Sequence, residues 1–352
     1  MIKGFNPEKV KKICVIRTSA LGDVVHAMAL MNALKYGFPN AEITWVLQPL
    51  AYDMVKNQGA ADHYVLFNRK GGKAHWKELK ARFKEDEYDL LLMLQVSIKA
   101  SAISTLIKAK HKLGFDMARS RECQWLFSNC RIPKRTPGHV QEQFFEFIEY
   151  LGVTDYPIEW NFGFTPEEEA KRAEFFDALP SPAFTMVVAS SSPDKDWPVE
   201  RCAEIVDYIA SKGYTPVLTG GPSDREKDLA NGICRHAKHK PVVALQNGIR
   251  GLLSMLSGSS VVISPDTGPL HMAVALDIPT ISLFGYSNPR RCGPFRRFHD
   301  LLIDRFTEEG DDGAKRYFKK DRMHLITVDD VKEKVDLAIS NYLLRGAGTS
   351  KP

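Results

Sequence analysis

The amino-acid sequence predicts an α/β protein with two Rossmann-like domains that face each other across a cleft. Short apolar runs alternate with amphipathic segments along the chain, which is typical of parallel sheets covered by helices. The alternation pauses once, in the aromatic- and proline-rich stretch 153–169, which is predicted to be a linker, and then restarts. The length of 352 residues also favours two domains over one.

The strands and helices follow from this alternation. In the first half, five apolar runs are predicted strands: 12–17, 42–48, 63–67, 88–95 and 111–115. Helical patterns cover 24–36 and 75–85. In the second half, the predicted strands are 184–190, 215–220, 241–245, 260–265 and 278–285, with helices at 198–212, 223–234 and 328–344. Thr327 is the expected N-cap of the last helix.

We therefore expect three parts: residues 1–160 as an N-terminal domain, 161–327 as a C-terminal domain, and 328–352 as a terminal helix and tail. In sheets of this kind ligands bind beyond the carboxyl ends of the strands. The loops that leave the predicted strands are thus the first places to look for function.

Composition narrows the class of protein. The chain has 44% hydrophobic and 26% charged residues, and no apolar run approaches the ~20 residues of a membrane-spanning helix. The charged N-terminus does not match a secretory signal. Six cysteines without a CxxC pair indicate reduced cytosolic thiols that mostly fill the core, with neither a zinc site nor a disulfide framework: Cys14, Cys123, Cys130, Cys202, Cys234 and Cys292.

The positive charge is concentrated in the first half. Residues 1–160 hold 23 Lys and Arg against 17 Asp and Glu, whereas the remainder holds 25 against 26. The excess lies mainly in 69–84 and 108–135. Such stretches are often only solvated helix faces, but they also fit a first half that binds an anionic partner. Nucleic acid is not expected, because no nucleic-acid-binding module is recognisable.

The loop after the first predicted strand reads "TSALGD". Gly22 permits a close approach of the backbone, and Asp23 opens the following helix. Asp is a preferred N-cap, so Asp23 has a purely structural alternative beside the role of a catalytic base. The dinucleotide fingerprint GxGxxG is absent from this loop.

The loop after 184–190 reads "SSSPDKDWPVER". Serine hydroxyls and Lys195 between a strand and a helix suit an anion such as a diphosphate. The triplet "DKD" also matches a metal-binding DxD pattern, but the lysine inside it works against cation binding. We expect no metal.

The loop "SPDTGPLHMA" (264–273) follows the fourth strand of the second half. Gly268 removes a side chain, and Pro269 suits the first turn of a helix. The backbone N–H groups of a helix start bind anions readily. The alternative is that Asp266 caps the helix and His271 is a core residue.

Together these motifs resemble glycosyltransferase family 9, the heptosyltransferases of lipopolysaccharide inner-core synthesis. The resemblance rests on "TSALGD", "SSSPDKDWPVER", "GGPSDREKDLA" and "SPDTGPLHMAVALDIPTISLFG" in this order. It implies a GT-B fold, ADP-heptose as co-substrate, inversion at the anomeric carbon and no metal or other cofactor. "FNRKGGK", "IKAS" and "ARSRE" favour the members that add the first heptose to the Kdo of lipid A, with heptosyltransferase II and later-acting members as alternatives.

The resemblance also implies residue roles. Asp23 falls at the position of the catalytic base, and either Asp224 or Glu226 at that of the ribose-binding acid. The remaining donor positions are Ser190, Ser191, Lys195, Asn247, Asp266, Thr267, Gly268 and His271. The acceptor positions are Arg69, Lys73, Lys99 and Arg121. The implied partners are a nucleotide-sugar and an anionic glycolipid, bound by a cytoplasmic protein in peripheral contact with the inner face of the inner membrane.

Two other functions fit the same motifs. A nucleotide-sugar 2-epimerase on this fold would need no acceptor site, and the basic stretches of the first half argue against it. A non-catalytic nucleotide-sugar-binding protein would need the second-half motifs but not Asp23, and the intact Gly22–Asp23 pair favours an enzyme.

Overall fold

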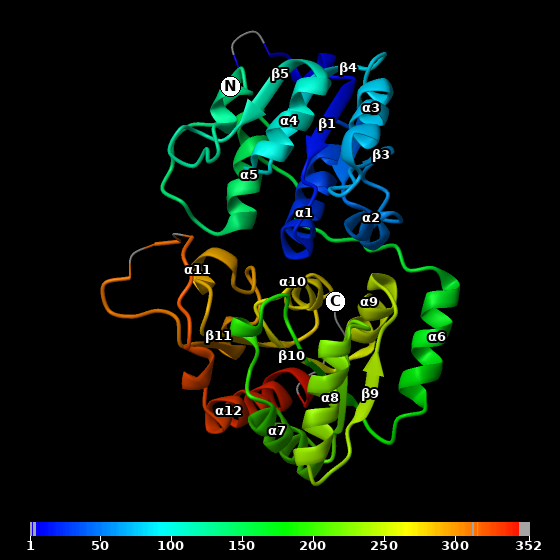
Figure 1. Cartoon of the computed structure of the whole chain (residues 1–352), viewed down its shortest axis with the longest axis vertical. Helices are drawn as coiled ribbons and strands as arrows, with labels where there is room; N and C mark the ends of the chain where they lie inside the picture. The colour runs from blue at the N-terminus through cyan, green and yellow to red at the C-terminus, as the bar shows by residue number, and fades with distance from the viewer. Residues whose placement is uncertain (1, 3–4, 312, 315, 345–352) are drawn as a thin grey trace. The chain divides into compact units, whose positions relative to one another are not determined.

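The computed structural model describes residues 2, 5–311, 313–314 and 316–344 (Figure 1). The chain divides into two compact units, Met1–Gly163 and Phe164–Pro352. Each contains one six-stranded sheet in which every strand pair is parallel. The prediction of two Rossmann-like α/β halves is therefore confirmed.

The sheet of the first unit has the strand order β3-β2-β1-β4-β5-β6. Its strands are β1 (Lys12–Ile16), β2 (Glu42–Leu47), β3 (His63–Leu66), β4 (Glu87–Met93), β5 (Lys108–Gly114) and β6 (Cys130–Arg131). The first five match the predicted runs, and β6 is new. The apolar residues of β1 and β4 are buried without alternation, as expected for central strands that are covered on both faces.

The helices of the first unit are α1 (Leu21–Gly37), α2 (Pro49–Val55), α3 (Gly72–Arg82), α4 (Ile98–Leu106) and α5 (Val140–Tyr150). Helix α1 is apolar on all sides and buries ten residues, which is typical of a helix enclosed by other elements. Helix α5 lies beside it (Figure 1). Helix α1 begins in the loop after β1, and Phe144 of α5 contacts Arg17 in the same loop.

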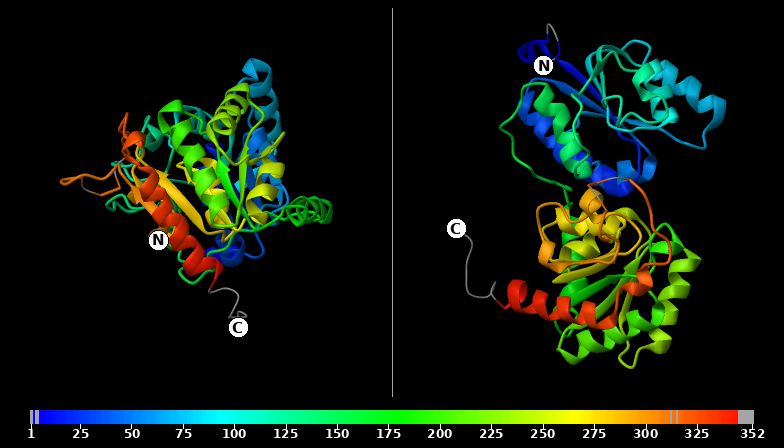
Figure 2. Two further views of the ribbon diagram at one scale, coloured as in Figure 1. Left: turned by 90° about the horizontal axis from the view of Figure 1, so that it is seen from below. Right: turned by 90° about the vertical axis from the view of Figure 1, so that its left-hand side faces the viewer.

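The sheet of the second unit has the order β12-β11-β10-β7-β8-β9. Its strands are β7 (Ala183–Val187), β8 (Thr215–Gly220), β9 (Val242–Leu245), β10 (Val261–Pro265), β11 (Thr280–Phe284) and β12 (Leu302–Asp304). The helices are α6 (Pro166–Asp177), α7 (Val199–Ser211), α8 (Asp224–His236), α9 (Ile249–Gly258), α10 (Gly268–Ala275), α11 (Pro289–Cys292) and α12 (Val328–Ala338). Helix α12 packs against α7 and β11 (Figures 1 and 2), so it is built into the second unit.

Thr327 caps α12, as expected, in a reciprocal capping box with Asp330. The last turns continue as a π-helix over Ile339–Leu343, and residues 345–352 of the predicted tail lie outside the described residues. No helix in the described part of the chain is long and apolar enough to cross a membrane.

The predicted linker 153–169 has no helix or strand up to residue 165, but its last four residues belong to α6, which begins at Pro166. The part before α6 is attached to the first unit. The indole of Trp160 donates to the carbonyl of Val25 at 3.0 Å. Gly163 has φ +56°, and a Cβ there would lie 2.1 Å from the carbonyl oxygen of Asn57, so only glycine fits at this position. The boundary between the units falls directly after it.

All six cysteines are free thiols. Cys14 and Cys202 are buried in the core, and burial raises the pKa of Cys202 to about 12 and that of Cys14 further still. Cys123 is exposed, and the other three are half-buried, so fewer of them fill the core than the sequence suggests.

Candidate active site

Each sheet gathers its candidate residues at one edge. Because all strands in a sheet are parallel, their carboxyl ends meet at the same edge, which we call the carboxyl edge. In the first unit the loops after β1, β3, β4 and β5 carry the candidates, and in the second unit the loops after β7, β8, β9 and β10.

Asp23 lies in the first turn of α1 and is not its N-cap. The N-cap is Ala20, which makes no side-chain hydrogen bond, so the structural alternative of a capping aspartate is wrong. The carboxylate of Asp23 instead forms an ion pair, through Oδ2, with the guanidinium of Arg17. The Asp23 side chain keeps 27% of its surface exposed.

Arg17 is itself held by two other elements. Its Nη1 donates to the carbonyl of Leu94 at 2.9 Å, and its guanidinium carbon lies 5.3 Å from the ring centre of Phe144 on α5. Only 11% of the Arg17 side chain is exposed. A fixed cation therefore sets the orientation of the Asp23 carboxylate.

His26 follows Asp23 by three residues on α1 and is the nearest histidine in the sequence. It is buried, and its Nδ1 lies 2.9 Å from Oε1 of Gln141 on α5. Its ring packs edge-on against His139 at 5.3 Å between ring centres. This is the environment of a core histidine.

The four predicted acceptor residues are all exposed on loops or first helical turns at the carboxyl edge of the first sheet. Arg69 follows β3, Lys73 and Lys99 lie in the first turns of α3 and α4, and Arg121 lies between β5 and β6. None has an ion-pair partner among the described residues. A cation near a helix N-terminus opposes the helix dipole, so helix stability does not explain Lys73 and Lys99.

The loop that carries Arg121 is anchored by a buried charge cluster. The guanidinium of Arg119 contacts Asp116 and binds both carboxylate oxygens of Glu146 on α5 at 2.7 and 2.8 Å. All three side chains are less than one tenth exposed. The cluster fixes the loop against α5, and Arg121 is exposed two residues after the buried Arg119.

In the second unit, Lys195 and Asp266 form one mostly buried contact. Lys195 Nζ donates to Oδ2 and to the backbone carbonyl of Asp266, both at 2.9 Å. Nε2 of His271 lies 3.3 Å from the other carboxylate oxygen, and the Ser287 hydroxyl donates to Oδ2. The structure thus joins three predicted residues from two loops and adds Ser287.

Asp266 is also not a helix cap, because Thr267 occupies the N-cap position of α10. Burial alone would raise the pKa of Asp266. The hydrogen bond from His271 and the positive charge of Lys195 outweigh burial and hold that pKa far below its usual range. The carboxylate is therefore ionised, and it holds Lys195 in front of the first turn of α10.

This pKa shift predicts an acid-sensitive second unit. A carboxyl group of an unfolded chain titrates near pH 3.9, and the folded pKa of Asp266 lies below that value. Its stabilising contribution is thus complete above about pH 4 and is lost as the pH falls through the folded pKa. We expect Asp266→Asn to lower the free energy of unfolding near neutral pH, and the deficit to shrink towards about pH 3. Urea unfolding of the wild type and the variant at both pH values measures this difference in the free energy of unfolding. A difference that does not change with pH would contradict the lowered pKa of Asp266.

The loop after β7 is internally braced, and Ser190 and Ser191 differ in exposure. Asp196 accepts from the backbone N–H of Ser190 at 2.9 Å and pairs with Arg225 of α8, whose Nη1 also donates to the Ser190 carbonyl. Ser190 is half-buried, whereas Ser191 is exposed.

The two carboxylates of "DKD" face different cations. Asp196 pairs with Arg225, and Asp194 lies 3.9 Å from Lys320. Among the described residues no group of three His, Cys, Asp or Glu side chains is arranged to hold a metal. The absence of a metal from the reaction stays a prediction.

The remaining donor candidates lie on neighbouring loops of this edge. Glu226 turns back over the loop after β8, where it accepts from the backbone N–H of Gly221 at 2.6 Å and from the Ser223 hydroxyl. Asp224 is almost fully exposed and pairs with Lys227. Asn247 is exposed directly after β9. The structure therefore separates the two alternatives for a ribose-binding acid.

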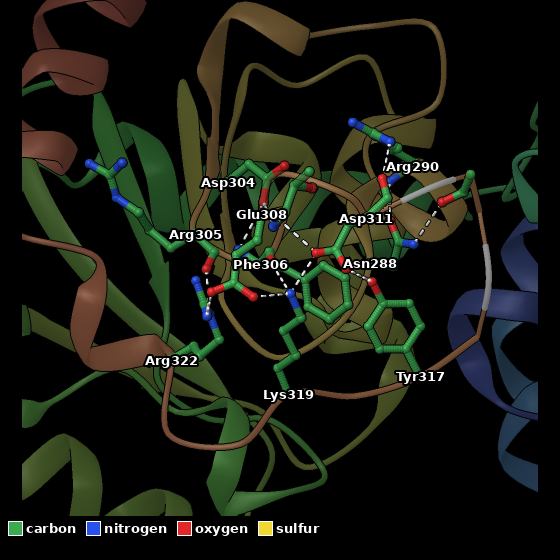
Figure 3. Close-up of polar contacts among 12 residues, drawn as sticks. Asn288, Arg290, Asp304, Arg305, Phe306, Glu308, Asp311, Tyr317, Lys319 and Arg322 are labelled. Carbon is green, nitrogen blue, oxygen red and sulfur yellow. Dashed lines mark hydrogen bonds and ion pairs between the residues drawn. The ribbon is translucent and has the colours of Figure 1, made fainter.

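The Ser287 loop is braced by the segment that follows β12. The backbone N–H of Lys319 donates to the carbonyl of Tyr286 at 2.9 Å. The Lys319 ammonium lies between acidic and aromatic side chains and contacts Glu308 at 2.7 Å and Asp311 at 2.5 Å (Figure 3). Because Ser287 donates to Asp266, this brace supports the Lys195–Asp266 contact.

Sequence analysis did not identify Arg17, Arg225 or Ser287. Arg17 follows β1 and Ser287 follows β11, so both lie in loops at a carboxyl edge. This position after a strand is the sequence feature that could have identified them as site residues. Arg225 has no such signal, because it reaches the β7 loop from α8.

Two Rossmann-like units, each with polar loops at its carboxyl edge, define a protein of the GT-B class. A model of glycosyltransferase family 9 (heptosyltransferase) matches residues 74–307. The lipopolysaccharide core heptosyltransferase OpsX of Haemophilus influenzae is 31% identical over 84% of this chain and 85% of its own length. Lipopolysaccharide heptosyltransferase 1 of Pseudomonas aeruginosa is 24% identical over 81% of this chain and 82% of its own. The chain belongs to glycosyltransferase family 9 and is a glycosyltransferase.

Solved structures agree with this fold. A glycosyl transferase of family 9 from Veillonella parvula superposes with a TM-score of 0.79 at 21% identity, covering 97% of this chain and 99% of that one. The Escherichia coli heptosyltransferase WaaC with ADP gives a TM-score of 0.71 at 22% identity, covering 93% and 99%. Family membership decides against an epimerase and against a non-catalytic binding protein.

Proposed function

We propose that this chain transfers heptose from ADP-heptose to the Kdo of a Kdo–lipid A acceptor, with inversion at the anomeric carbon and without a metal. The observation that carries the proposal is the Arg17–Asp23 ion pair, which presents an oriented and partly exposed carboxylate at the carboxyl edge of the first sheet. The names of the relatives, heptosyltransferases of the lipopolysaccharide core, support the substrate class.

We assign the diphosphate of the donor to the edge of the second sheet. Lys195, Ser190, Ser191, Thr267 and the backbone N–H groups at the start of α10 supply positive charge and hydrogen-bond donors. Negative charge that develops on the departing ADP is stabilised by such prearranged groups without a cation. Asp266 and His271 keep Lys195 in place.

The nucleoside part of the donor is assigned to the loops after β8 and β9. Glu226 is the better candidate for the ribose hydroxyls, because its carboxylate lies over the β8 loop whereas that of Asp224 points into solvent. Asn247, two residues after the end of β9, is assigned to the adenine.

Asp23 is assigned as the general base. The ion pair with Arg17 engages Oδ2, and Oδ1 is then available to accept the proton of the acceptor hydroxyl. Proton removal makes this hydroxyl oxygen a better nucleophile as it attacks the anomeric carbon of the heptose. The bond to the ADP oxygen breaks on the opposite face, and this accounts for inversion.

The acceptor is assigned to the exposed cations of the first unit. Kdo–lipid A carries carboxylate and phosphate groups. Four cations lie at the carboxyl edge of the first sheet without an ion-pair partner in the described part of the chain: Arg69, Lys73, Lys99 and Arg121. Because the lipid part of such an acceptor lies in a membrane, we infer that the protein is cytoplasmic and works in peripheral contact with the inner membrane.

Replacement of Arg69, Lys73 and Arg121 by glutamine is expected to raise the acceptor KM far more than the donor KM. Added salt should reproduce part of this loss in the wild type, because exposed charges are screened over ~10 Å at 0.1 M. Steady-state kinetics with each substrate varied in turn measures both constants. Equal increases in the two KM values would instead indicate damage to the fold.

The acceptor itself is tested by a comparison of two substrates. We expect transfer to Kdo–lipid A that lacks heptose, and little transfer to an acceptor that already carries one heptose. The reverse preference would make this chain a heptosyltransferase II or a later-acting enzyme, and would leave the donor assignment intact.

A further inference from the structure

Four large apolar side chains are exposed near the acceptor cations of the first unit. Ile98 is 52%, Met117 57%, Trp125 36% and Leu126 62% exposed. We call these four residues the 98–126 patch. They lie on the two segments that follow the neighbouring strands β4 and β5. Exposed apolar side chains gathered at one edge of a domain mark an interaction site.

The elements that carry the patch are tied together. The backbone N–H of Ile98 donates to Oε2 of Glu122 at 2.7 Å, which joins the start of α4 to the loop before Trp125. Met117 Sδ lies 3.2 Å from Nη1 of Arg131, the residue that pairs with Gly114 at the end of β5.

The turn with Trp125 and Leu126 is rigidly attached to the sheet. Between β5 and β6, Gln124 is fully buried, and its Nε2 donates to the carbonyls of Met93 at 2.9 Å and Gln95 at 3.1 Å. The buried Gln124 side chain thus fixes the turn to the sheet, and the side chains of Trp125 and Leu126 remain exposed on it.

The rim of the patch is cationic. Lys99 follows Ile98, Arg121 precedes the Trp125 turn, and Arg131 contacts Met117; Lys134 lies a few residues further on, and all four are exposed. The acidic groups nearby are already engaged: Glu122 accepts from Ile98, and Asp116 is buried against Arg119. The surface therefore combines apolar side chains with a net positive rim.

We propose that the 98–126 patch docks on an anionic phospholipid bilayer, with its apolar side chains inserted at the headgroup boundary and its cations on the lipid phosphates. This combination is the one that interfacial membrane binding requires. A stable protein–protein interface buries about 1,200–2,000 Å², and four half-exposed side chains supply only a small part of that. The proposal rests on the proposed function, since Lys99 and Arg121 would then meet the acceptor headgroup where its lipid leaves the bilayer.

The test is vesicle flotation of the full chain with phosphatidylethanolamine vesicles, with and without phosphatidylglycerol. The variant is Ile98→Ser/Met117→Ser/Leu126→Ser. The control is Tyr36→Ser, which removes a 57% exposed side chain in the last turn of α1, away from the carboxyl edge.

We expect the wild type and the control to float with the anionic vesicles. The triple variant should bind them at least about tenfold more weakly, since burial of one aliphatic side chain alone changes a partition constant by roughly that factor. Unchanged binding of the triple variant, or equal wild-type binding to vesicles without phosphatidylglycerol, would overturn the proposal. Self-association of the wild type that the triple variant lacks would reassign the patch to a second copy of the chain.

Activity separates this proposal from the function on which it rests. With an acceptor stripped of its fatty acyl chains, the triple variant should match the wild type, whereas with acceptor in vesicles its apparent KM should rise. A triple variant that loses activity on the stripped acceptor would overturn the docking role. If the wild type glycosylates neither the stripped acceptor nor the acceptor in vesicles, the proposed function is wrong. Flotation then still decides whether the 98–126 patch binds lipid.

Discussion

Asp23→Asn is expected to lower kcat by at least about a hundredfold, the lower end of what general-base catalysis contributes. An amide cannot accept the proton of the acceptor hydroxyl, although it has nearly the same shape as the carboxylate. The variant should still bind ADP, because every proposed donor contact lies in the second unit. Its melting temperature should change by only a few degrees, because the Asn amide oxygen can still accept from Arg17, and Arg17 keeps its contacts with the Leu94 carbonyl and the Phe144 ring.

A matched control is Asp53→Asn. Asp53 lies on α2 of the same unit, pairs with Lys56 at 3.6 Å and is 51% exposed. It should leave kcat, ADP affinity and melting temperature unchanged. If Asp23→Asn keeps a rate within a few-fold of the wild type, Asp23 is not the base. Its pairing with Arg17 would then be purely structural, and the base would have to come from another residue.

Lys195→Ala is expected to weaken ADP binding roughly tenfold to a hundredfold, since a hydrogen bond to a charged group contributes about 1.5–3 kcal/mol. It should also destabilise the second unit. The Lys195 and Asp266 side chains are only 17% and 12% exposed, and removal of one partner of a buried pair leaves the other charge uncompensated. Isothermal titration calorimetry with ADP measures the loss of affinity, and urea unfolding measures the loss of stability.

Lys195→Ala/Asp266→Asn distinguishes donor binding from fold damage. The double variant no longer buries an uncompensated carboxylate, so its stability should recover relative to Lys195→Ala, whereas ADP affinity should stay low. Lys227→Ala removes a lysine from an exposed pair of the same unit and should change neither quantity. Unaltered ADP affinity in Lys195→Ala, or loss of wild-type activity in excess EDTA, would refute the metal-free donor site.

The strand framework of both units is predictable from the sequence because buried parallel strands read as continuous apolar runs. All ten predicted strands are present, with ends that differ by a few residues. β6 and β12 have two and three residues, too few to give a pattern. Helix α5 was not predicted, although the spacing of Val140, Phe144 and Phe147 is that of the apolar face of a helix. The alternation of strands and helices alone does not indicate a helix there.

The partners of the site residues are less predictable, because they come from distant parts of the chain. Asp23 is near Arg17 in sequence, but the groups that hold Arg17 lie at Leu94 and Phe144. The ion pair of Asp266 needs Lys195 from a loop 71 residues earlier, and its further partner Ser287 follows the next strand. Position at a carboxyl edge is readable from a sequence, whereas the choice between helix cap and ion pair depends on the packing of several elements.

Transfer of heptose from ADP-heptose to Kdo–lipid A is the central claim, and the mass of the acceptor after incubation tests it most directly. The purified chain is incubated with both substrates, and the acceptor is weighed by mass spectrometry while released ADP is measured. We predict an acceptor heavier by one heptosyl residue and one ADP for each residue transferred, with both products formed at least about a hundredfold more slowly by Asp23→Asn. Release of ADP with an acceptor of unchanged mass, or no consumption of ADP-heptose by the wild type, would contradict the account.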